Sequence, residues 1–302
     1  MMAAAFSAST TNDRLMVSCR SCGGRNETTY LLSAGYRIAR CEQCGLWYVN
    51  PQPTVDELSQ FYAMYDDGEQ WRSREEDFNR GVRKAILRFA SSGSLLDAGC
   101  GSGDFLRCMR EVGFQVNGIE PSETGCSWAR ETHGIEVFQG MLEDYLTASN
   151  RSTFEVVSLL NVLEHLRDPK EMLMQLRKLI KPNGILAVVV PDARFHDFIG
   201  RLRGAVGIAD PYWLEQSHSV LSGFKLPDHL SSFQPRTISF LLEQCGFEVL
   251  RVQNAPVVLN PNVFRNALKA SVRYVGQTLY YLSLRNFTFG YSTLVICKKP
   301  QQ

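Results

Sequence analysis

The chain has 302 residues, 44% hydrophobic and 21% charged, with 32 Lys and Arg residues against 31 Asp and Glu residues. This length favours one large domain with a minor one, and a net charge of +1 argues against a broad basic field for nucleic acid or membrane. No apolar run approaches the roughly 20 residues that span a bilayer, and the first residues lack a secretory signal, so we expect a cytoplasmic protein with reduced cysteines.

Residues 1–15 are expected to form a disordered leader. The segment 51–92 is expected to be a helical linker or cover, because Asn50-Pro51-Gln52-Pro53 interrupts the chain before it. Within it, a helix is predicted to begin at Thr54 or Asp56. A second helix is predicted over Arg74–Ala90, where apolar residues recur at helical spacing.

Two cysteine pairs lie in a turn-rich segment, residues 16–50, which we expect to form a zinc ribbon. The pairs are Cys19-x-x-Cys22 and Cys41-x-x-Cys44, with 18 residues between them. This spacing is typical of a tetrahedral zinc site made of four cysteines. Because four protein ligands leave no open coordination position, the predicted Zn²⁺ is structural.

Residues 93–300 alternate short apolar strands with longer amphipathic segments. The predicted strands are Ser94–Ala98, Gln115–Ile119, Ile135–Phe138, Val156–Leu160, Ile185–Val190, Glu248–Val252 and Ser292–Lys298. Helices are predicted from Asp104, from Ser122, over Pro169–Ile180 and over Pro235–Cys245. This rhythm predicts a doubly wound, mostly parallel seven-stranded α/β sheet, with insertions at 192–234 and 254–290. The first insertion is expected to cover an active site.

The strand at Ser94–Ala98 runs into a glycine-rich turn. The turn is Asp97-x-Gly99-x-Gly101-x-Gly103, and a helix follows at once. Glycines let the chain turn tightly and let a ligand approach the backbone, while the helix start offers unpaired N–H groups. A dinucleotide fingerprint needs glycine where Asp104 stands, so a dehydrogenase is disfavoured.

An acidic residue ends the next predicted strand. Glu120 follows Gly103 by 17 residues, which fits a β-α-β unit with a ligand across its strand ends. A carboxylate at that position is placed to accept hydrogen bonds from two ribose hydroxyls.

On these residues the chain resembles the class I S-adenosylmethionine-dependent methyltransferases, over about residues 80–300. The resemblance implies that the glycine turn cradles the methionine part of the cofactor and that Glu120 holds its ribose. It assigns these residues to the cofactor site: Asp97, Gly99, Cys100, Gly101, Gly103, Glu120, Pro121, Asp144 and Asn161. Glu143 competes with Asp144 for the adenine amine, and Asp144 is favoured.

Two histidines are candidates for a catalytic base. His165 lies near the end of Ser158–Leu166, which resembles the family's fourth-strand motif, and His229 begins a His-Leu-x-x-Phe element of the same broad group. Either could remove a proton near neutral pH, and His229 is favoured because it ends the cover segment. A quinone-pathway branch holds a divalent metal with Glu-x-x-Glu-His; here Asn161 replaces its first acid, so no active-site metal is predicted.

The cysteine module and the cofactor motifs together resemble a bacterial group of small-molecule methyltransferases. The resemblance implies O- or C-methylation of a sugar, nucleotide sugar, quinone or other biosynthetic intermediate. The alternative is a zinc-ribbon nucleic-acid-binding protein whose methyltransferase domain modifies RNA or is degenerate. Asn161-Val162-Leu163-Glu164 is not a base-methylating motif, so nucleic acid is the less favoured partner.

Within the second insertion, residues 263–284 have a helical apolar pattern flanked by Arg265, Lys269 and Arg273. Such a helix could touch a membrane surface peripherally, although it more often packs on its own domain or on a second subunit. The chain is accordingly expected to be a monomer or a homodimer.

Overall fold

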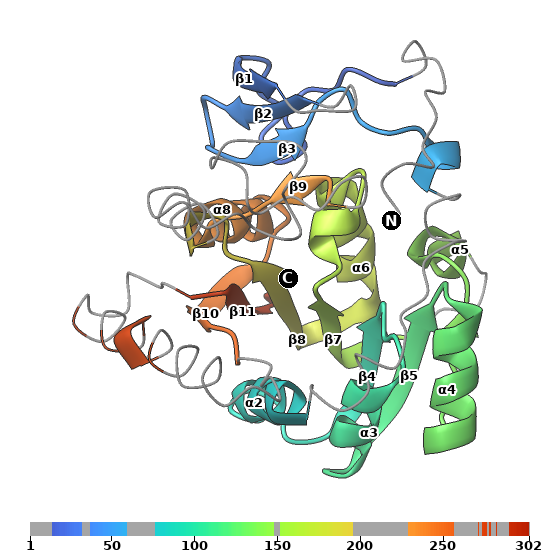
Figure 1. The fold of residues 1–302 in the computed structure, drawn as a ribbon. Coiled ribbons are helices and arrows are strands. Elements are labelled where there is room, and N and C mark those ends of the chain that lie inside the picture. Colours follow the sequence, from blue (N-terminus) through green and yellow to red (C-terminus); the bar gives the residue numbers. More distant parts are fainter. Residues whose placement is uncertain are drawn as a thin grey trace.

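The structure is a computed structural model that describes residues 14–31, 37–58, 76–147, 152–195, 229–256, 271, 274–276, 278, 282 and 290–301. These residues form a seven-stranded sheet and a four-stranded sheet (Figure 1). The larger sheet consists of β4 (Gly93–Ala98), β5 (Phe114–Glu120), β6 (Phe138–Gln139), β7 (Phe154–Leu160), β8 (Ile180–Pro191), β10 (Glu248–Asn254) and β11 (Ser292–Lys298).

The strand order of the larger sheet is β10-β11-β8-β7-β4-β5-β6. β11 is antiparallel to both of its neighbours, and the pairs from β8 to β6 are parallel. The predicted doubly wound, mostly parallel sheet of seven strands is therefore confirmed. Chain order reverses between β4 and β7, and the carboxyl ends of such neighbouring strands form the usual ligand crevice of this architecture.

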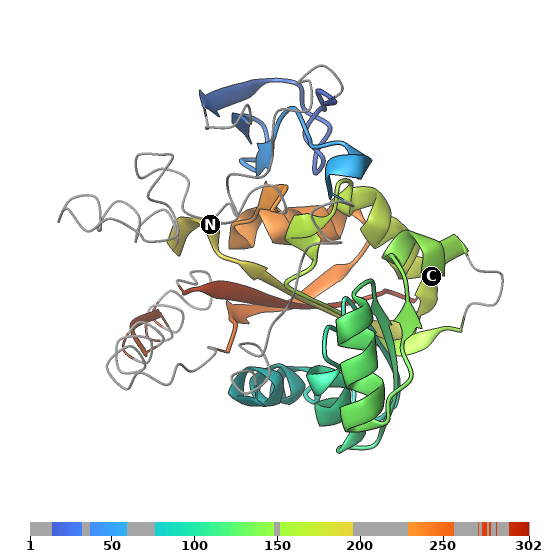
Figure 2. The ribbon, with the colours of Figure 1, turned by 45° about the vertical axis from the view of Figure 1, so that its right-hand side comes forward.

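Helices cover both faces of this sheet (Figure 2). The helices are α2 (Glu76–Ile86), α3 (Asp104–Arg110), α4 (Glu123–His133), α5 (Leu142–Thr147), α6 (Pro169–Leu179) and α8 (Pro235–Gln244), with a short 3-10 turn η1 (Leu163–His165). Alternate residues of β4 face opposite sides. Leu95 packs in the core with α2 and α3, and Leu96 packs in the core with α6 and α8.

The smaller sheet belongs mainly to the cysteine module. Its antiparallel order is β1 (Glu27–Leu31), β2 (Arg37–Cys41), β3 (Trp47–Val49) and β9 (Ser231–Ser232). The fourth strand comes from the far end of the first insertion. Tyr48 of the module is fully buried in the same core as Phe233 and Ile238, so module and large sheet share one hydrophobic interior.

Several element bounds differ from the sequence prediction. β6 is a two-residue edge strand, because only Phe138 and Gln139 pair with β5. β8 begins at Ile180, and its register with β7 shifts before Ile185, so the predicted start at Ile185 is the start of its regular part. α5 and the three strands of the module were not predicted individually.

The last residues of the predicted leader contact the first residues of the predicted linker. Arg14 forms an ion pair of 2.7 Å with Glu57, and Leu15 bridges to Gln52. Burial alone would raise the pKa of Glu57, but hydrogen bonds from Arg14 and from the Thr54 N–H lower it.

Residues 1–13, 59–75 and most of the insertions 192–234 and 254–290 lie outside the described residues, and so does most of 263–284. The predicted domain boundaries and the predicted membrane contact therefore stay predictions. Within the described chain, no helix has the length and apolar character needed to cross a bilayer.

Candidate active site

The three glycines of the turn after β4 have three different surroundings. Gly99 has φ +78°, and a Cβ there would lie 2.5 Å from Val162 Cγ2. Gly103 has φ +77°, and its Cβ would lie 3.0 Å from Ala129 Cβ of α4. Gly101 has φ +52°, and nothing lies within 4 Å of its Cβ position. Gly99 and Gly103 thus permit close packing, while Gly101 leaves open space for a ligand at the carboxyl end of β4.

Glu120 meets this turn directly. Its Oε2 accepts a hydrogen bond of 2.8 Å from the Gly101 N–H, its Oε1 accepts one of 2.9 Å from the Ser122 N–H, and the residue is 7% exposed. Asp97 is buried and accepts a hydrogen bond of 2.6 Å from Ser158 Oγ. The predicted ribose acceptor and the glycine turn therefore form one surface, which Asp97 ties to β7.

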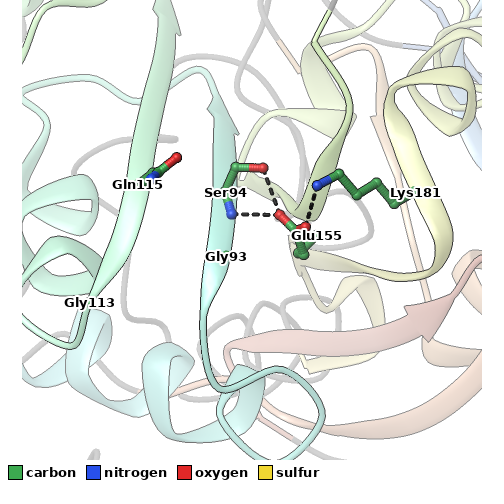
Figure 3. Close-up of a pocket in the computed structure, with 6 residues that line it drawn as sticks. All are labelled: Gly93, Ser94, Gly113, Gln115, Glu155 and Lys181. Carbon is green, nitrogen blue, oxygen red and sulfur yellow. Dashed lines mark hydrogen bonds and ion pairs between the residues drawn. The ribbon is translucent and has the colours of Figure 1, made fainter.

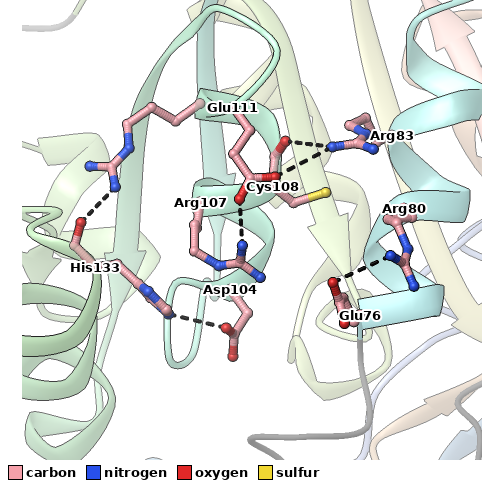
Figure 4. Close-up of polar contacts among 9 residues, drawn as sticks. Glu76, Arg80, Arg83, Asp104, Arg107, Cys108, Glu111 and His133 are labelled. Carbon is pink, nitrogen blue, oxygen red and sulfur yellow. Dashed lines mark hydrogen bonds and ion pairs between the residues drawn. The ribbon is translucent and has the colours of Figure 1, made fainter.

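The first residue of α3 has a partner that sequence reasoning missed. Asp104 Oδ1 lies 3.0 Å from His133 Nε2 (Figure 4). Asp104 Oδ2 accepts a hydrogen bond of 2.7 Å from Ser102 Oγ. Nothing in the local sequence of His133 indicates that the end of α4 meets the start of α3. The acid in the first turn of α3 also suits the positive end of the helix dipole.

Asp144 and Pro121 are exposed near the carboxyl ends of β5 and β6. Asp144 Oδ2 accepts a hydrogen bond of 3.1 Å from the Met141 N–H at the start of α5. The Gly140 N–H donates to the Glu120 carbonyl at 3.0 Å, which fastens this turn to the end of β5. The residue predicted to contact adenine therefore lies just after the turn that follows β6.

Asn161 and Cys100, two other predicted cofactor residues, differ in backbone conformation and in burial. Asn161 has φ +56° and follows β7, with its N–H donating to the Val189 carbonyl at 2.9 Å. Left-handed backbone at a non-glycine residue is strained, and such strain often occurs at functional sites. Cys100 is buried, and its Sγ lies against Gly118, where a Cβ would approach it to 2.6 Å. Burial raises the pKa of Cys100. Its N–H donates to the Ile119 carbonyl at 3.0 Å, and its carbonyl accepts from the Gly103 N–H at 2.9 Å.

The two predicted base candidates lie in contact. The rings of His165 and His229 are edge to face, with centroids 4.7 Å apart and an angle of 87°. Ligand atoms of these histidines and of the buried Glu164 all lie within 4.8 Å of one another. The structure thus brings together two histidines that are far apart in sequence.

A carboxylate with two histidines is also a donor set that suits a divalent transition metal. The sequence motif contains Glu164 and His165 alone, and His229 is added by the fold. Among the described residues, this trio and the four module cysteines are the groups with metal-ligand geometry. The prediction that no metal occupies the active site stays a prediction.

The four module cysteines converge. Sγ–Sγ distances are 3.4 Å for Cys19 and Cys44 and 3.5 Å for Cys22 and Cys41, and all four sulfurs lie within 4.8 Å. Tetrahedral zinc with bonds of about 2.3 Å needs sulfurs about 3.8 Å apart, so the set fits this ion. Hydrogen bonding from Cys19 lowers the pKa of Cys44 to about 5, and the same contact raises that of Cys19.

Small residues allow this convergence. The Gly24 N–H points to Cys22 Sγ at 3.4 Å, and a Cβ on Gly24 would lie 3.3 Å from Cys41 Sγ. Gly23 and Gly45 both have positive φ, as expected of turns that aim amide N–H groups at sulfur.

A polar pocket of about 200 Å³ lies near the amino ends of β4, β5, β7 and β8, opposite the end of the sheet that carries the glycine turn (Figure 3). It is lined by Gly93, Ser94, Gly113, Gln115, Glu155 and Lys181. Glu155 pairs with Lys181 and accepts 2.6 Å from the Ser94 N–H. Burial would raise the pKa of Glu155, but these bonds lower it to about 2. This pocket lies at the other end of β4 from the glycine turn. The ion pair that lines it has a structural role.

The similarity of this chain to known proteins agrees with this geometry. Residues 71–252, more than half of the chain, match the family described as methyltransferase domain. The chain belongs to this family. A ubiquinone biosynthesis O-methyltransferase of Caulobacter vibrioides is 36% identical over 121 residues, covering 38% of this chain and 48% of the relative. One from Caulobacter sp. strain K31 is 33% identical over 164 residues, covering 50% and 64%. The chain thus spans about half to two thirds of the length of these curated relatives.

Solved structures of methyltransferases have the same fold at low sequence identity. One is a SAM-dependent methyltransferase from Archaeoglobus fulgidus, with 19% identity, TM-score 0.50 and coverage of 82% of this chain and 100% of that one. Another is 1,6-didemethyltoxoflavin-N1-methyltransferase from Burkholderia thailandensis, with 15% identity, TM-score 0.52 and coverage of 90% and 99%. The predicted methyltransferase fold is confirmed by this likeness and by the family match.

Proposed function

We propose that the protein is an S-adenosylmethionine-dependent methyltransferase that methylates a hydroxyl group of a small-molecule acceptor. The observation that carries this proposal lies at the carboxyl edge of the large sheet. Gly101, with open space at its Cβ position, follows β4, and Glu120 ends β5. The His165–His229 pair lies just beyond β7. This arrangement supports a cofactor cradle at the carboxyl ends of β4 and β5 and a proton acceptor beyond the carboxyl end of the neighbouring β7.

Bound S-adenosylmethionine would supply an electrophilic methyl group on a sulfonium. The turn from Asp97 to Gly103 would hold its methionine part, Glu120 its ribose hydroxyls, and Asp144 its adenine amine. Asp97 and Asn161 would fix the ends of β4 and β7, so that the acceptor and the methyl group are aligned.

The acceptor hydroxyl must lose a proton as it is methylated. His229 would take this proton on a ring nitrogen, with His165 against its ring and the Glu164 carboxylate within 4.8 Å to stabilise the imidazolium. The remaining work of the site is orientation and the exclusion of water.

The relatives support a small-molecule acceptor over RNA. Both Caulobacter proteins are named as O-methyltransferases of ubiquinone biosynthesis. We therefore favour a phenolic hydroxyl of a quinone precursor as the acceptor class, ahead of a sugar hydroxyl or a carbon acid. Asn161, where that branch has an acid, marks a departure from its metal-binding motif.

We further infer that the module holds one structural Zn²⁺ and that the protein works in a reducing compartment such as the cytoplasm. Four converging thiols support the zinc site. None of the nine cysteines, all of them in the described residues, forms a disulfide, which supports a reducing compartment.

Calorimetry tests the cofactor site. We expect micromolar binding of S-adenosylmethionine and of S-adenosylhomocysteine, and loss of both in Gly101→Val, whose side chain would fill the open space. Gly113→Val is the matched control, because Gly113 also has positive φ and open surroundings but lies at the amino end of β5. Tight NAD binding without S-adenosylmethionine binding would overturn the proposed function.

A further inference from the structure

We propose that the cysteine module positions the catalytic base, so that zinc binding is coupled to methyl transfer without contact to the cofactor. The unit that couples them is the histidine segment, residues 229–233, which begins at His229. The proposal rests on the proposed function for its catalytic readout, and on the fold alone for its structural readout.

The module is hydrogen-bonded to the histidine segment along its length. In the β3–β9 ladder, Trp47 pairs with Ser232 and Tyr48 with Ser231. The Val49 N–H then donates to the Leu230 carbonyl at 2.9 Å, one residue after His229. An isolated two-residue strand has no stability of its own, so β9 depends on β3 for its conformation.

On its other side the histidine segment is hydrogen-bonded to the residues that follow β7 and β8 of the large sheet. The Leu230 N–H donates to the Glu164 carbonyl at 2.8 Å, and the Ala193 N–H donates to the Phe233 carbonyl at 2.9 Å. Leu230 and Phe233 are at most 1% exposed. The segment therefore lies between module and sheet, and removal of the module would expose one edge of it.

The module and the residues just after it also contact the chain next to His165. Gln52 Nε2 donates to the Arg167 carbonyl at 3.0 Å, and Arg20 forms an ion pair of 3.1 Å with Asp168. Arg167 and Asp168 follow His165 by two and three positions. The module and the residues just after it thus contact both chain segments that supply the histidine pair.

Metal ligands form the turn that sets β3. Cys41 ends β2, the Gly45 N–H donates to the Cys41 carbonyl at 2.9 Å, and the Cys41 N–H donates to the Leu46 carbonyl at 2.9 Å. Cys44 lies inside this hairpin. Zinc held by Cys41 and Cys44 would therefore fix the hairpin from which β3 extends to the histidine segment.

The cofactor cradle is built without the module. The Gly99 and Cys100 N–H groups donate to the Ile119 carbonyl at 2.8 and 3.0 Å, and the Gly101 N–H donates to Glu120. All of these contacts lie between β4 and β5 or the turn that follows β4. Loss of the module's order should therefore reduce catalysis while leaving cofactor affinity unchanged.

Hydrogen exchange on the full-length protein tests the coupling. Removal of zinc with a chelator should raise amide exchange in residues 229–233 by about tenfold or more, while exchange in residues 97–103 stays constant. S-adenosylhomocysteine affinity should stay within about twofold, and methyl transfer should fall and recover when Zn²⁺ is restored. Unchanged exchange in residues 229–233 after loss of zinc would overturn the proposal.

Val49→Pro tests the same link without touching a metal ligand. Proline removes the N–H that donates to Leu230, so exchange in residues 229–233 should rise although zinc content and S-adenosylhomocysteine affinity are retained. Val49→Ala keeps this N–H and should keep the protection of the segment. Should Val49→Pro lose zinc or cofactor binding through misfolding, the chelation experiment decides. Failure of the wild type to bind S-adenosylhomocysteine would instead count against the proposed function, and the exchange data would still judge the coupling.

Discussion

At the residue scale, a glycine can be required by packing or by backbone conformation alone. Gly99 and Gly101 follow the same strand and both have positive φ, but only Gly99 has a neighbour, Val162, at its Cβ position. This pair therefore separates the cost of strain from the cost of a clash.

Gly99→Ala should lower the free energy of unfolding by about 2–4 kcal/mol, since it adds both left-handed strain and overlap with Val162. Gly101→Ala should cost only about 1–2 kcal/mol, from strain. Urea unfolding measures both. Equal losses in the two variants would contradict the packing role assigned to Gly99.

Glu120→Ala should weaken binding of S-adenosylhomocysteine by about 1.5–3 kcal/mol, because hydrogen bonds to a charged acceptor are lost. Calorimetry measures the change. Glu123→Ala, an exposed acid on the first turn of α4, serves as the control and should bind normally. Normal binding by Glu120→Ala would remove Glu120 from the cofactor site.

His229→Gln should lower kcat by about 10²–10⁴-fold, as expected for loss of a general base, with little change in cofactor affinity. His165→Gln tests the second candidate in the same single-turnover assay. Rates should not depend on added Mg²⁺ or Mn²⁺ if the pair acts on a proton. Wild-type rates in both variants across pH 6–9 would exclude either histidine as the base and favour an amine acceptor that needs only alignment.

At the element scale, one ion pair joins the start of β7 to the irregular start of β8. Glu155 and Lys181 close this junction at the edge of the sheet (Figure 3). Since the folded state holds the pKa of Glu155 at about 2, below its ordinary 4.5, the pair stabilises the fold above about pH 4.5. That contribution is lost as the pH falls from 4.5 towards 2.

Glu155→Gln should therefore destabilise the protein at pH 6 by about 1 kcal/mol or less, because both side chains are partly exposed to screening by water. The difference between wild type and variant should shrink as the pH is lowered through this window. Urea unfolding at several pH values measures it, with the exposed Glu143→Gln as the control. A difference that grows in acid would show that the sign is wrong.

At the scale of the whole molecule, module and sheet are joined by one core and by β9. Tyr48 and Phe233 pack in the same cluster although one belongs to the module and the other lies at the end of the first insertion. Order in the module should therefore affect the stability of the whole chain.

Elemental analysis should find one zinc per chain. Cys22→Ser/Cys41→Ser should lose the metal and lower the midpoint of thermal unfolding, because metal binding contributes folding free energy. Cys245→Ser is the control, since Cys245 is not one of the four converging cysteines and its Sγ donates to the Lys170 carbonyl of α6 at 3.6 Å. Full zinc content in the double variant would refute the site.

The sequence alone determined the parts of this protein that depend on local spacing. The alternation of strands and helices predicted the seven-stranded sheet, and the cysteine spacing predicted a cluster that the structure brings together. The turn from Asp97 to Gly103 and Glu120 predict a cofactor edge, which stays a prediction. Each of these features depends on short repeated units or on tight turns, for which periodicity and residue type are sufficient.

Only the tertiary structure decided which distant residues meet. The contact of His165 with His229, the addition of β9 to the module and the bond between Asp104 and His133 each join separate elements. Cys100 shows the same limit within a motif, since its side chain packs against Gly118 and its N–H and carbonyl are hydrogen-bonded to Ile119 and Gly103. Such contacts follow from how whole elements pack, and the local pattern of a single chain does not specify which faces will be pressed together.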